Sequence, residues 1–212
     1  MVVERPGDYW RVPSVAQDYE AERFHHVKGY VYRGLEERAL QRALRGLGPG
    51  TTVLDAACGT GRVTALLRRR GFRPTGCDIS RAMMSVARRQ LAAVGDDVPL
   101  VENTVEALPF RDKSFDAVTC IGLLMHLDTD VRRRALRELA RVSRGRLVIQ
   151  YVCTGALLRV KSYVTGRPTG GVRYPVSQTE MRMDFEESGL TERARFWILR
   201  GLSSSVIVVL TR

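Results

Sequence analysis

The sequence has no long hydrophobic run. None of its apolar stretches approaches the roughly 20 residues that a membrane-spanning helix requires, and the first residues do not form the apolar core of a secretory signal. These two absences predict a cytoplasmic protein without a membrane span.

Cysteine is scarce, and its spacing excludes the usual cysteine-based sites. Cys58, Cys77, Cys120 and Cys153 form no CxxC pair and no zinc-ligand pattern. Each lies in or beside a predicted buried strand or turn, so we expect four reduced, buried thiols and no bound metal. An alternative is that Cys120 and Cys153, near the ends of neighbouring strands, bind a thiophilic acceptor such as arsenite.

Lysine is almost absent, although the net charge is +11. Only 3 of the 34 basic residues are lysines, and the arginines are spread along the chain rather than gathered with aromatic residues. A strongly basic protein often binds nucleic acid. The wide distribution of the arginines argues against nucleic acid as a partner, although nucleic acid stays an alternative. The distribution favours solvated arginine faces, such as the outer face of a helix expected near 129–142, which carries Arg133, Arg134, Arg137 and Arg141.

Strands and helices alternate along most of the chain. After a helix expected at 35–47, strands are expected at 52–55, 74–77, 99–102, 115–120 and 146–152. Helical segments separate them, except that a turn at 111–114 introduces the fourth strand. Such alternation indicates a parallel sheet covered by helices on both faces. The last two strands, expected at 191–199 and 203–210, are joined by three residues. So short a connection requires an antiparallel pair.

The length of 212 residues suits a single α/β domain. We expect 1–31 to be an N-terminal lead-in that covers the site and 32–152 to be the cofactor-binding core. An insertion on the substrate side follows at 153–178, and a helix with the antiparallel strand pair occupies 179–212. The protein is expected to be a monomer or a homodimer.

A glycine turn is the most informative stretch of the chain. An apolar strand at 53–55 runs into a turn that contains Gly59 and Gly61, and a helix follows. Glycines let the backbone come close to a ligand, and the free N–H groups at a helix start can bind it. A second strand ends at Asp78, whose carboxylate can accept hydrogen bonds from ribose hydroxyls. This order of elements is typical of a site for an adenosine-containing cofactor.

Two residues distinguish this turn from a dinucleotide site. A dinucleotide-binding turn prefers a third glycine where this chain has Thr64. Asp55, just before the turn, suits a cationic ligand better than a pyrophosphate. Both residues argue against a nicotinamide-binding protein.

Four motifs together resemble those of the class I S-adenosylmethionine-dependent methyltransferases. Residues 53–61 resemble the first motif, and 76–80 followed by Met83 look like the second. Residues 106–110, leading to 114–118, are similar to the third motif and the fourth strand, and 122–127 resemble the segment after it. The resemblance covers about residues 35–152 and is greatest to small-molecule methyltransferases related to those of quinone biosynthesis.

The resemblance implies an α/β fold, a Rossmann-like, mostly parallel seven-stranded sheet of order 3-2-1-4-5-7-6, with the last strand antiparallel and helices on both faces. It implies S-adenosylmethionine as the cofactor, S-adenosylhomocysteine as the product, and in-line methyl transfer to a small-molecule acceptor. Two alternatives stay open: methylation of RNA or another macromolecule, and a module that binds the cofactor without catalysis.

The resemblance also implies roles for individual residues. The methionine part of the cofactor would lie against Gly59, Gly61, Ala57 and Ile121, with Asp55 near its amino group. The ribose would be held by Asp78, and the adenine would lie beside Ile79 and Met83, with Thr104 and Val105 at its edge. Tyr19 and Arg23 match positions that often close over the methionine carboxylate. The family often has an acid where this chain has Thr104, and a hydroxyl accepts hydrogen bonds more weakly.

His126 is the candidate catalytic base, because it follows the fourth strand at the carboxyl end of the sheet, where ligands bind. A base is needed only for an acceptor such as a hydroxyl, and a packed, hydrogen-bonded histidine is the alternative. Candidates to contact the acceptor are the aromatic and basic residues Tyr9, Trp10, His25, His26, Tyr163 and Arg173. The sequence lacks an Asn-Pro-Pro-Tyr run and a Pro-Cys pair after the fourth strand. These absences argue against amino methylation of adenine or glutamine and against cytosine C5 methylation.

Overall fold

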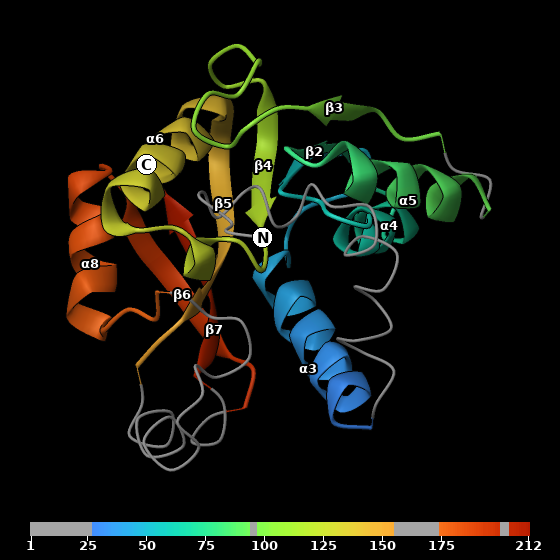
Figure 1. Cartoon of the computed structure of the whole chain (residues 1–212). Helices are drawn as coiled ribbons and strands as arrows, with labels where there is room; N and C mark the ends of the chain where they lie inside the picture. The colour runs from blue at the N-terminus through green and yellow to red at the C-terminus, as the bar shows by residue number, and fades with distance from the viewer. Residues whose placement is uncertain (1–26, 94–96, 155–173, 200–203) are drawn as a thin grey trace, which may run out of the picture.

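Seven strands form one sheet in the computed structural model of the chain, which describes residues 27–93, 97–154, 174–199 and 204–212 (Figure 1). Their order, β3-β2-β1-β4-β5-β7-β6, confirms the predicted order. The strands are β1 Thr52–Ala56, β2 Arg73–Asp78, β3 Leu100–Glu102, β4 Phe115–Cys120, β5 Ser143–Val152, β6 Thr191–Trp197 and β7 Ser205–Thr211.

The sheet is parallel except at one side. β1 pairs in parallel with β2 and β4, β2 with β3, and β4 with β5. β7 lies antiparallel between β5 and β6, as predicted for the last strand. Ala56, the last residue of β1, is level with Cys77 of β2 and Cys120 of β4. The residues that follow these strands therefore meet at one edge of the sheet.

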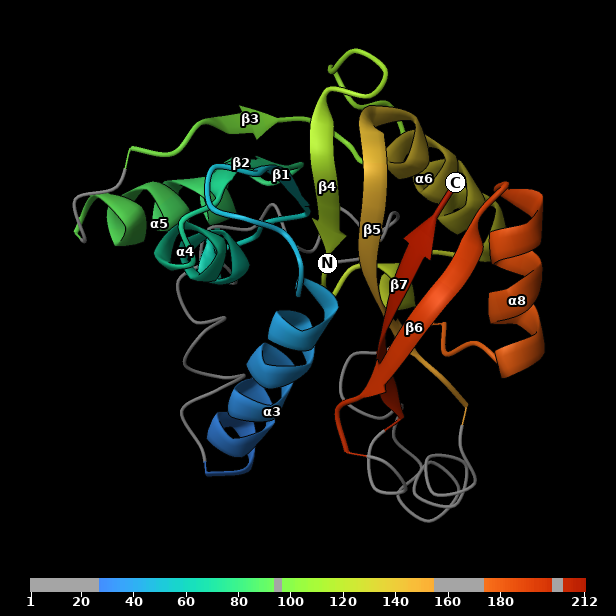
Figure 2. The same ribbon diagram turned by 180° about the vertical axis from the view of Figure 1, so that it is seen from behind.

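Helices cover both faces of the sheet (Figures 1 and 2). On one face, α3 (Val27–Ala43) and α4 (Arg62–Arg69) share a buried cluster with strand residues such as Val148. α5 (Arg81–Ala92) packs close to the start of α4. The other face carries α6 (Thr129–Val142) and α8 (Gln178–Glu187). Within the described ranges, none of the helices has the length and hydrophobicity of a membrane span.

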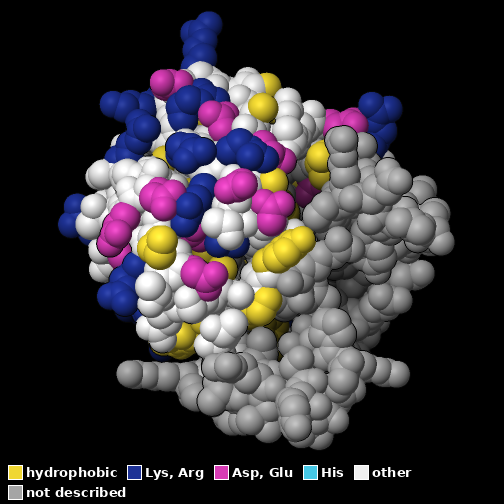
Figure 3. Space-filling view, turned by 60° about the vertical axis from the view of Figure 1, so that its left-hand side comes forward, with side chains coloured by type: hydrophobic (Ala, Val, Ile, Leu, Met, Phe, Trp, Pro, Cys, Tyr) yellow, Lys and Arg dark blue, Asp and Glu magenta, His cyan; other side chains and the backbone are white. Residues whose placement is uncertain are grey.

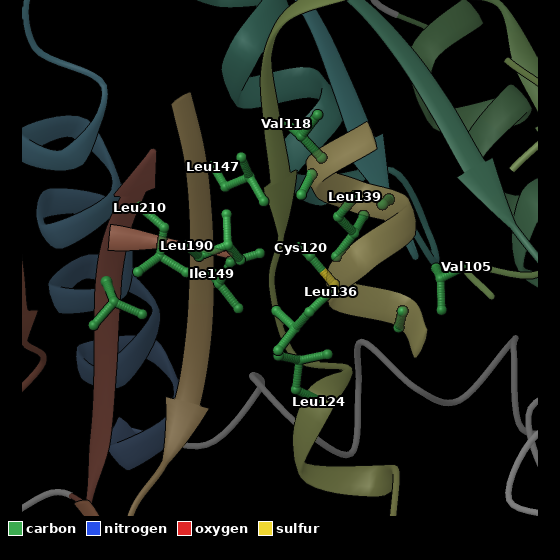
Figure 4. Close-up of a cluster of buried hydrophobic side chains, with 14 of the residues drawn as sticks. Val105, Val118, Cys120, Leu124, Leu136, Leu139, Leu147, Ile149, Leu190 and Leu210 are labelled. Atoms are coloured by element: carbon green, nitrogen blue, oxygen red, sulfur yellow. The ribbon is translucent and has the colours of Figure 1, made fainter. Parts of the chain in front are cut away.

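The larger buried cluster fills the space between the sheet and the helices α6 and α8 (Figure 4). Leu136 and Leu139 of α6 pack with Val118 of β4, Ile149 of β5 and Leu190 after α8. Burial of such apolar surface is the dominant favourable contribution to folding. The cluster also includes Leu124 of η1 (Leu124–His126), the short 3-10 helix after β4. Packing in this core therefore fixes the segment that carries His126.

The first described helix begins earlier than the sequence indicates. Residues 27–31, predicted to be part of the lead-in, form the first turns of α3, which ends at Ala43 rather than at residue 47. The apolar pattern could not reveal this start, because Val27, Tyr30 and Val31 are exposed to solvent by 81%, 74% and 53%. An apolar stripe marks only the part of a helix that packs on a core.

The arginines on the outer face of α6 are not simply solvated. Arg133 pairs with Asp184 and Glu187 of α8, and Arg134 pairs with Glu106. Arg141 pairs with Glu138 and Asp112, and it also donates to two loop carbonyls. Figure 3 shows basic and acidic side chains interspersed over one face of the molecule. The predicted arginine face is thus largely neutralised by acidic residues of the same chain.

A buried ion pair joins α6 to α8. Arg132 is 1% exposed, and its Nε donates to Asp184 Oδ2 at 2.6 Å. The Tyr151 hydroxyl of β5 donates to the same oxygen at 3.3 Å. Arg132 Nη1 reaches the carbonyl oxygen of Leu127 at 3.4 Å, directly after η1. The pair therefore holds the chain at the carboxyl end of β4.

Candidate functional site

The glycine turn between β1 and α4 contains three residues in the left-handed region. Ala57, Gly59 and Gly61 have φ values of 58°, 54° and 85°. A Cβ added at Gly59 would meet no atom of the described residues within 4 Å, whereas one at Gly61 would lie 3.0 Å from the Ala87 Cβ. Gly61 therefore permits α4 and α5 to pack, and Gly59 leaves open space above the turn. A left-handed alanine such as Ala57 is strained, and such strain is common at functional sites.

Asp78 ties the end of β2 to the glycine turn. Its Oδ2 accepts a hydrogen bond from the Gly59 N–H at 2.8 Å, and its Oδ1 accepts one from the Ser80 N–H at 2.8 Å. The side chain is 8% exposed. Burial raises the pKa of Asp78, and hydrogen bonds from the backbone of Ser80, Gly59 and Ile79 oppose that rise. The carboxylate is thus held in one position at the sheet edge.

Asp55 is buried between β1, α4 and β4. Thr64 Oγ1 donates to its Oδ2 at 2.6 Å, and Thr119 Oγ1 donates to its Oδ1 at 3.0 Å. Burial raises the pKa of Asp55 from 3.8 to about 6, and the two threonine hydroxyls limit the rise. Thr64, which takes the place of a third glycine, is thus a partner of Asp55. Sequence reasoning missed this role, and its only signal was the departure from the glycine pattern.

The residues predicted to meet the adenosine gather at the ends of β2 and β3. Ser80 caps α5 by accepting a hydrogen bond from the Met83 N–H at 3.2 Å, and Met83 is buried. Ile79 is partly exposed. The Asn103 N–H donates to the Asp78 carbonyl at 3.0 Å, which brings the loop after β3 to the same edge. In that loop Thr104 is partly exposed and Val105 belongs to the larger core.

Ile121 and His126 follow β4. Ile121 is partly buried and packs against the cluster under α3 and α4. His126 lies in η1 and is 9% exposed. The Tyr174 N–H donates to the Met125 carbonyl at 2.9 Å, so the chain that returns from the predicted insertion lies against η1. The structure places His126 at the carboxyl end of the sheet, and its role as a base stays a prediction.

Several predicted site residues lie outside the described residues. They are Tyr9, Trp10, Tyr19, Arg23, His25 and His26 of the lead-in, and Tyr163 and Arg173 of the insertion. Their roles stay predictions, as do the limits of the expected domain parts.

The cysteines are buried and in the thiol form. Burial raises the pKa of Cys77 to about 12 and that of Cys153 to about 11, and it raises the pKa of Cys58 and Cys120 as well. A protonated thiol is a poor nucleophile and a poor metal ligand, so the arsenite alternative gains no support. Among the described residues no three His, Cys, Asp or Glu side chains are grouped as metal ligands.

A family model described as a methyltransferase domain matches residues 53–145. That range contains the glycine turn, Asp78 and η1. The matched residues, just under half of the chain, form a methyltransferase domain. This assignment confirms the predicted family and agrees with the predicted cofactor.

Relatives with assigned functions match about half of the chain. A demethylmenaquinone methyltransferase of Mycolicibacterium paratuberculosis is 41% identical over 115 residues, which cover 53% of this chain and 46% of that protein. A probable tRNA methyltransferase 9B of Mus musculus is 38% identical over 95 residues, which cover 44% of this chain and 20% of that protein. The chain thus spans less than half the length of these relatives.

Solved methyltransferase structures share the whole architecture. Magnesium protoporphyrin IX methyltransferase from Synechocystis PCC 6803, crystallised with bound S-adenosylhomocysteine, has a TM-score of 0.79 at 20% identity and 97% coverage of both chains. A putative methyltransferase in complex with the Haloferax volcanii Trm112 activator has a TM-score of 0.68 at 20% identity. At this identity the likeness establishes the fold.

Replacing Gly61 with alanine should destabilise the fold more than replacing Gly59. Both glycines have positive φ, so alanine costs about 1–2 kcal/mol at either position. Only at residue 61 does the new Cβ press against Ala87, and overpacking adds about 1–3 kcal/mol. Urea denaturation of the two variants measures the difference, and equal losses would contradict this account of Gly61.

Asp55→Asn should change how stability depends on pH. The folded-state pKa of about 6 lies above the ordinary 3.8, so the unfolded chain loses this proton first as the pH rises. Ionisation of the buried Asp55 lowers the free energy of unfolding. This loss is absent below about pH 4, grows between about pH 4 and 6, and is constant at higher pH. The free energy of unfolding of the wild type should therefore fall by about 3 kcal/mol relative to that of the variant over this range. Urea denaturation at a series of pH values measures both, and parallel curves would refute the raised pKa.

Proposed function

We propose that this protein transfers a methyl group from S-adenosylmethionine to a small-molecule acceptor. The observation that carries the proposal is the hydrogen-bonded pair of Gly59 and Asp78, with no atom of the described residues within 4 Å of the place where a Cβ of residue 59 would lie. Because Gly59 has no side chain, an adenosine-containing ligand can come close to the backbone of the turn. The adjacent Asp78 carboxylate can accept hydrogen bonds from the hydroxyls of that ligand.

The charges of the site fit a cationic cofactor. An ionised carboxylate can accept about four hydrogen bonds, so Asp78 can receive a ribose hydroxyl in addition to the backbone N–H groups of Gly59, Ser80 and Ile79. Asp55 places a second carboxylate behind the turn, although its oxygens already accept from two threonines. It would act on the sulfonium and the ammonium group of the cofactor through charge. A direct contact with the amino group is the role predicted from the resemblance.

Catalysis would come mainly from positioning. Methyl transfer from a sulfonium disperses charge, so it needs no strong acid, and well-oriented reactants can gain about 7–11 kcal/mol from proximity. His126 would remove a proton where the acceptor is a hydroxyl or similar acid. Its place after β4, in a segment fixed by the core and by the Arg132–Asp184 pair, supports this role.

Two observations favour a small-molecule acceptor. Two relatives, matched over 115 and 104 residues, are demethylmenaquinone methyltransferases, and three of the α6 arginines are paired with acids of the same chain. The tRNA methyltransferase relative favours RNA as the second candidate. Incubation with labelled S-adenosylmethionine and either reduced demethylmenaquinone or tRNA tests the two, and RNA binding that weakens steeply with salt would support the second.

S-adenosylhomocysteine should stabilise the wild type. Asp78→Ala should weaken the binding of S-adenosylhomocysteine at least tenfold, because a hydrogen bond to a charged group contributes about 1.5–3 kcal/mol. At about 100 times the dissociation constant the ligand should add about 2.7 kcal/mol to the free energy of unfolding of the wild type. Calorimetry and thermal unfolding measure both effects.

Asp116→Ala is the matched control. Asp116 also accepts from a backbone N–H of a neighbouring strand, that of Thr52 at 2.9 Å, but it lies at the opposite end of the sheet. We expect this variant to bind S-adenosylhomocysteine within about twofold of the wild type. Equal binding by Asp78→Ala and the wild type would rule out the ribose role.

His126→Ala should reduce kcat about 100-fold or more on a hydroxyl acceptor and flatten the acidic side of the pH profile of kcat, since a positioned base contributes about 10²–10⁴-fold. Binding of S-adenosylhomocysteine should stay unchanged. Unaltered turnover together with an unaltered pH profile would mean that His126 is a packing residue.

A further inference from the structure

A cluster of buried polar side chains lies under α3 and outside the predicted cofactor contacts. Gln150 of β5 is fully buried, and Glu36 of α3 is 1% exposed. Gln150 Nε2 donates to Glu36 Oε1 at 2.8 Å and to the Tyr32 hydroxyl oxygen at 3.1 Å. Arg62, the first residue of α4, pairs with the other oxygen of Glu36. The Tyr32 hydroxyl donates to Ser205 of β7 at 3.0 Å.

The partners fix the orientation of the Gln150 amide. Glu36 is a carboxylate paired with an arginine, so it can only accept hydrogen bonds. A flipped amide would place its own oxygen against that carboxylate. The observed orientation leaves Gln150 Oε1 buried and without a hydrogen-bond partner in the described part of the chain. Since nearly all buried polar groups are hydrogen-bonded, this oxygen requires an explanation.

The strand pairings place Gln150 relative to the predicted cofactor site. Cys120 of β4 is level with Ile149 of β5, so Gln150 is level with Ile121. Gln150 lies on the same face as Val148, and Ile121 packs against the cluster that contains Val148. Strands lie about 4.8 Å apart, so Gln150 is about 10 Å along the edge from Ala57 of the glycine turn. It therefore lies one strand beyond the last predicted cofactor contact.

We propose that the side-chain oxygen of Gln150 binds a hydroxyl or N–H group of the methyl acceptor. This inference rests on the proposed function and adds a recognition element to the same site. Because Arg62 already balances the charge of Glu36, the cluster offers a neutral hydrogen-bond acceptor. A neutral donor, such as a phenolic hydroxyl, suits it better than a free cation.

Two small aromatic probes test the proposal without the natural acceptor. Phenol carries the hydroxyl, and anisole keeps the ring and the oxygen but has no hydrogen to donate. The wild type, saturated with S-adenosylhomocysteine, should bind phenol about tenfold more tightly than anisole, as one buried hydrogen bond allows. Calorimetry measures both. Equal affinities, or binding of neither probe, would overturn the proposal and leave a buried water as the partner of the oxygen.

Gln150→Met keeps the length of the side chain and removes its polar atoms, so the preference for phenol should disappear. Ser188→Ala is the matched control, because among the described residues it removes the other buried side-chain atom without a partner, at the end of α8. This variant should keep the preference. A preference that survives in Gln150→Met would refute the proposal. In the wild type, the side-chain amide signals of Gln150 in NMR spectra should shift with phenol and not with anisole, which keeps the test valid if the methionine variant does not fold.

The cofactor distinguishes this proposal from the proposed function. Gln150→Met should bind S-adenosylhomocysteine as the wild type does. A loss of about tenfold there, with no preference for phenol in the wild type, would assign the oxygen to the amino group of the cofactor and overturn the proposal. If S-adenosylhomocysteine does not bind the wild type, the proposed function fails, and the phenol preference of the protein alone still decides whether Gln150 binds a donor.

Discussion

The hydrogen bond between the Gly59 N–H and the Asp78 carboxylate is the interaction on which the site depends. It joins the turn after β1 to the end of β2, so two segments that follow different strands act as one surface. The second oxygen of Asp78 accepts from Ser80, the residue that caps α5. One carboxylate thus organises the turn, the neighbouring helix start and the adjacent strand end. Its burial makes this arrangement rigid, because a displaced Asp78 would leave backbone N–H groups unsatisfied.

Buried acids recur around this edge, and each has a different kind of partner. Asp78 accepts from backbone N–H groups, Asp55 from two threonine hydroxyls, and Glu36 from an arginine and a glutamine amide. A carboxylate satisfied by neutral donors keeps a charge that can act on a cationic ligand, whereas one paired with arginine does not. The negative charge at the edge is therefore concentrated beside the glycine turn, and the polar cluster under α3 is close to neutral.

Much of the fold followed from local patterns. The glycine turn, the cap at Ser80 and the alternation of strands and helices predicted the sheet, and the short link at 200–202 predicted the antiparallel pair. The start of α3 was missed, because its first turns expose their apolar side chains. The burial of Arg132 was also missed, because an arginine on a helix with four others resembles a surface residue until α8 brings Asp184 against it.

Residue spacings within short segments were enough to predict the methyltransferase motifs and the kind of cofactor site, and the resemblance that these motifs carry implied the order of the strands. The pairing of polar groups could not be predicted in this way, because it depends on how the chain folds. Asp55 and Thr119 are 64 residues apart, and Glu36 and Gln150 are 114 residues apart. Such pairs arise only when folding makes distant segments neighbours and removes water from between them. Burial then determines which acceptors are satisfied and which, like the oxygen of Gln150, have no partner within the described chain.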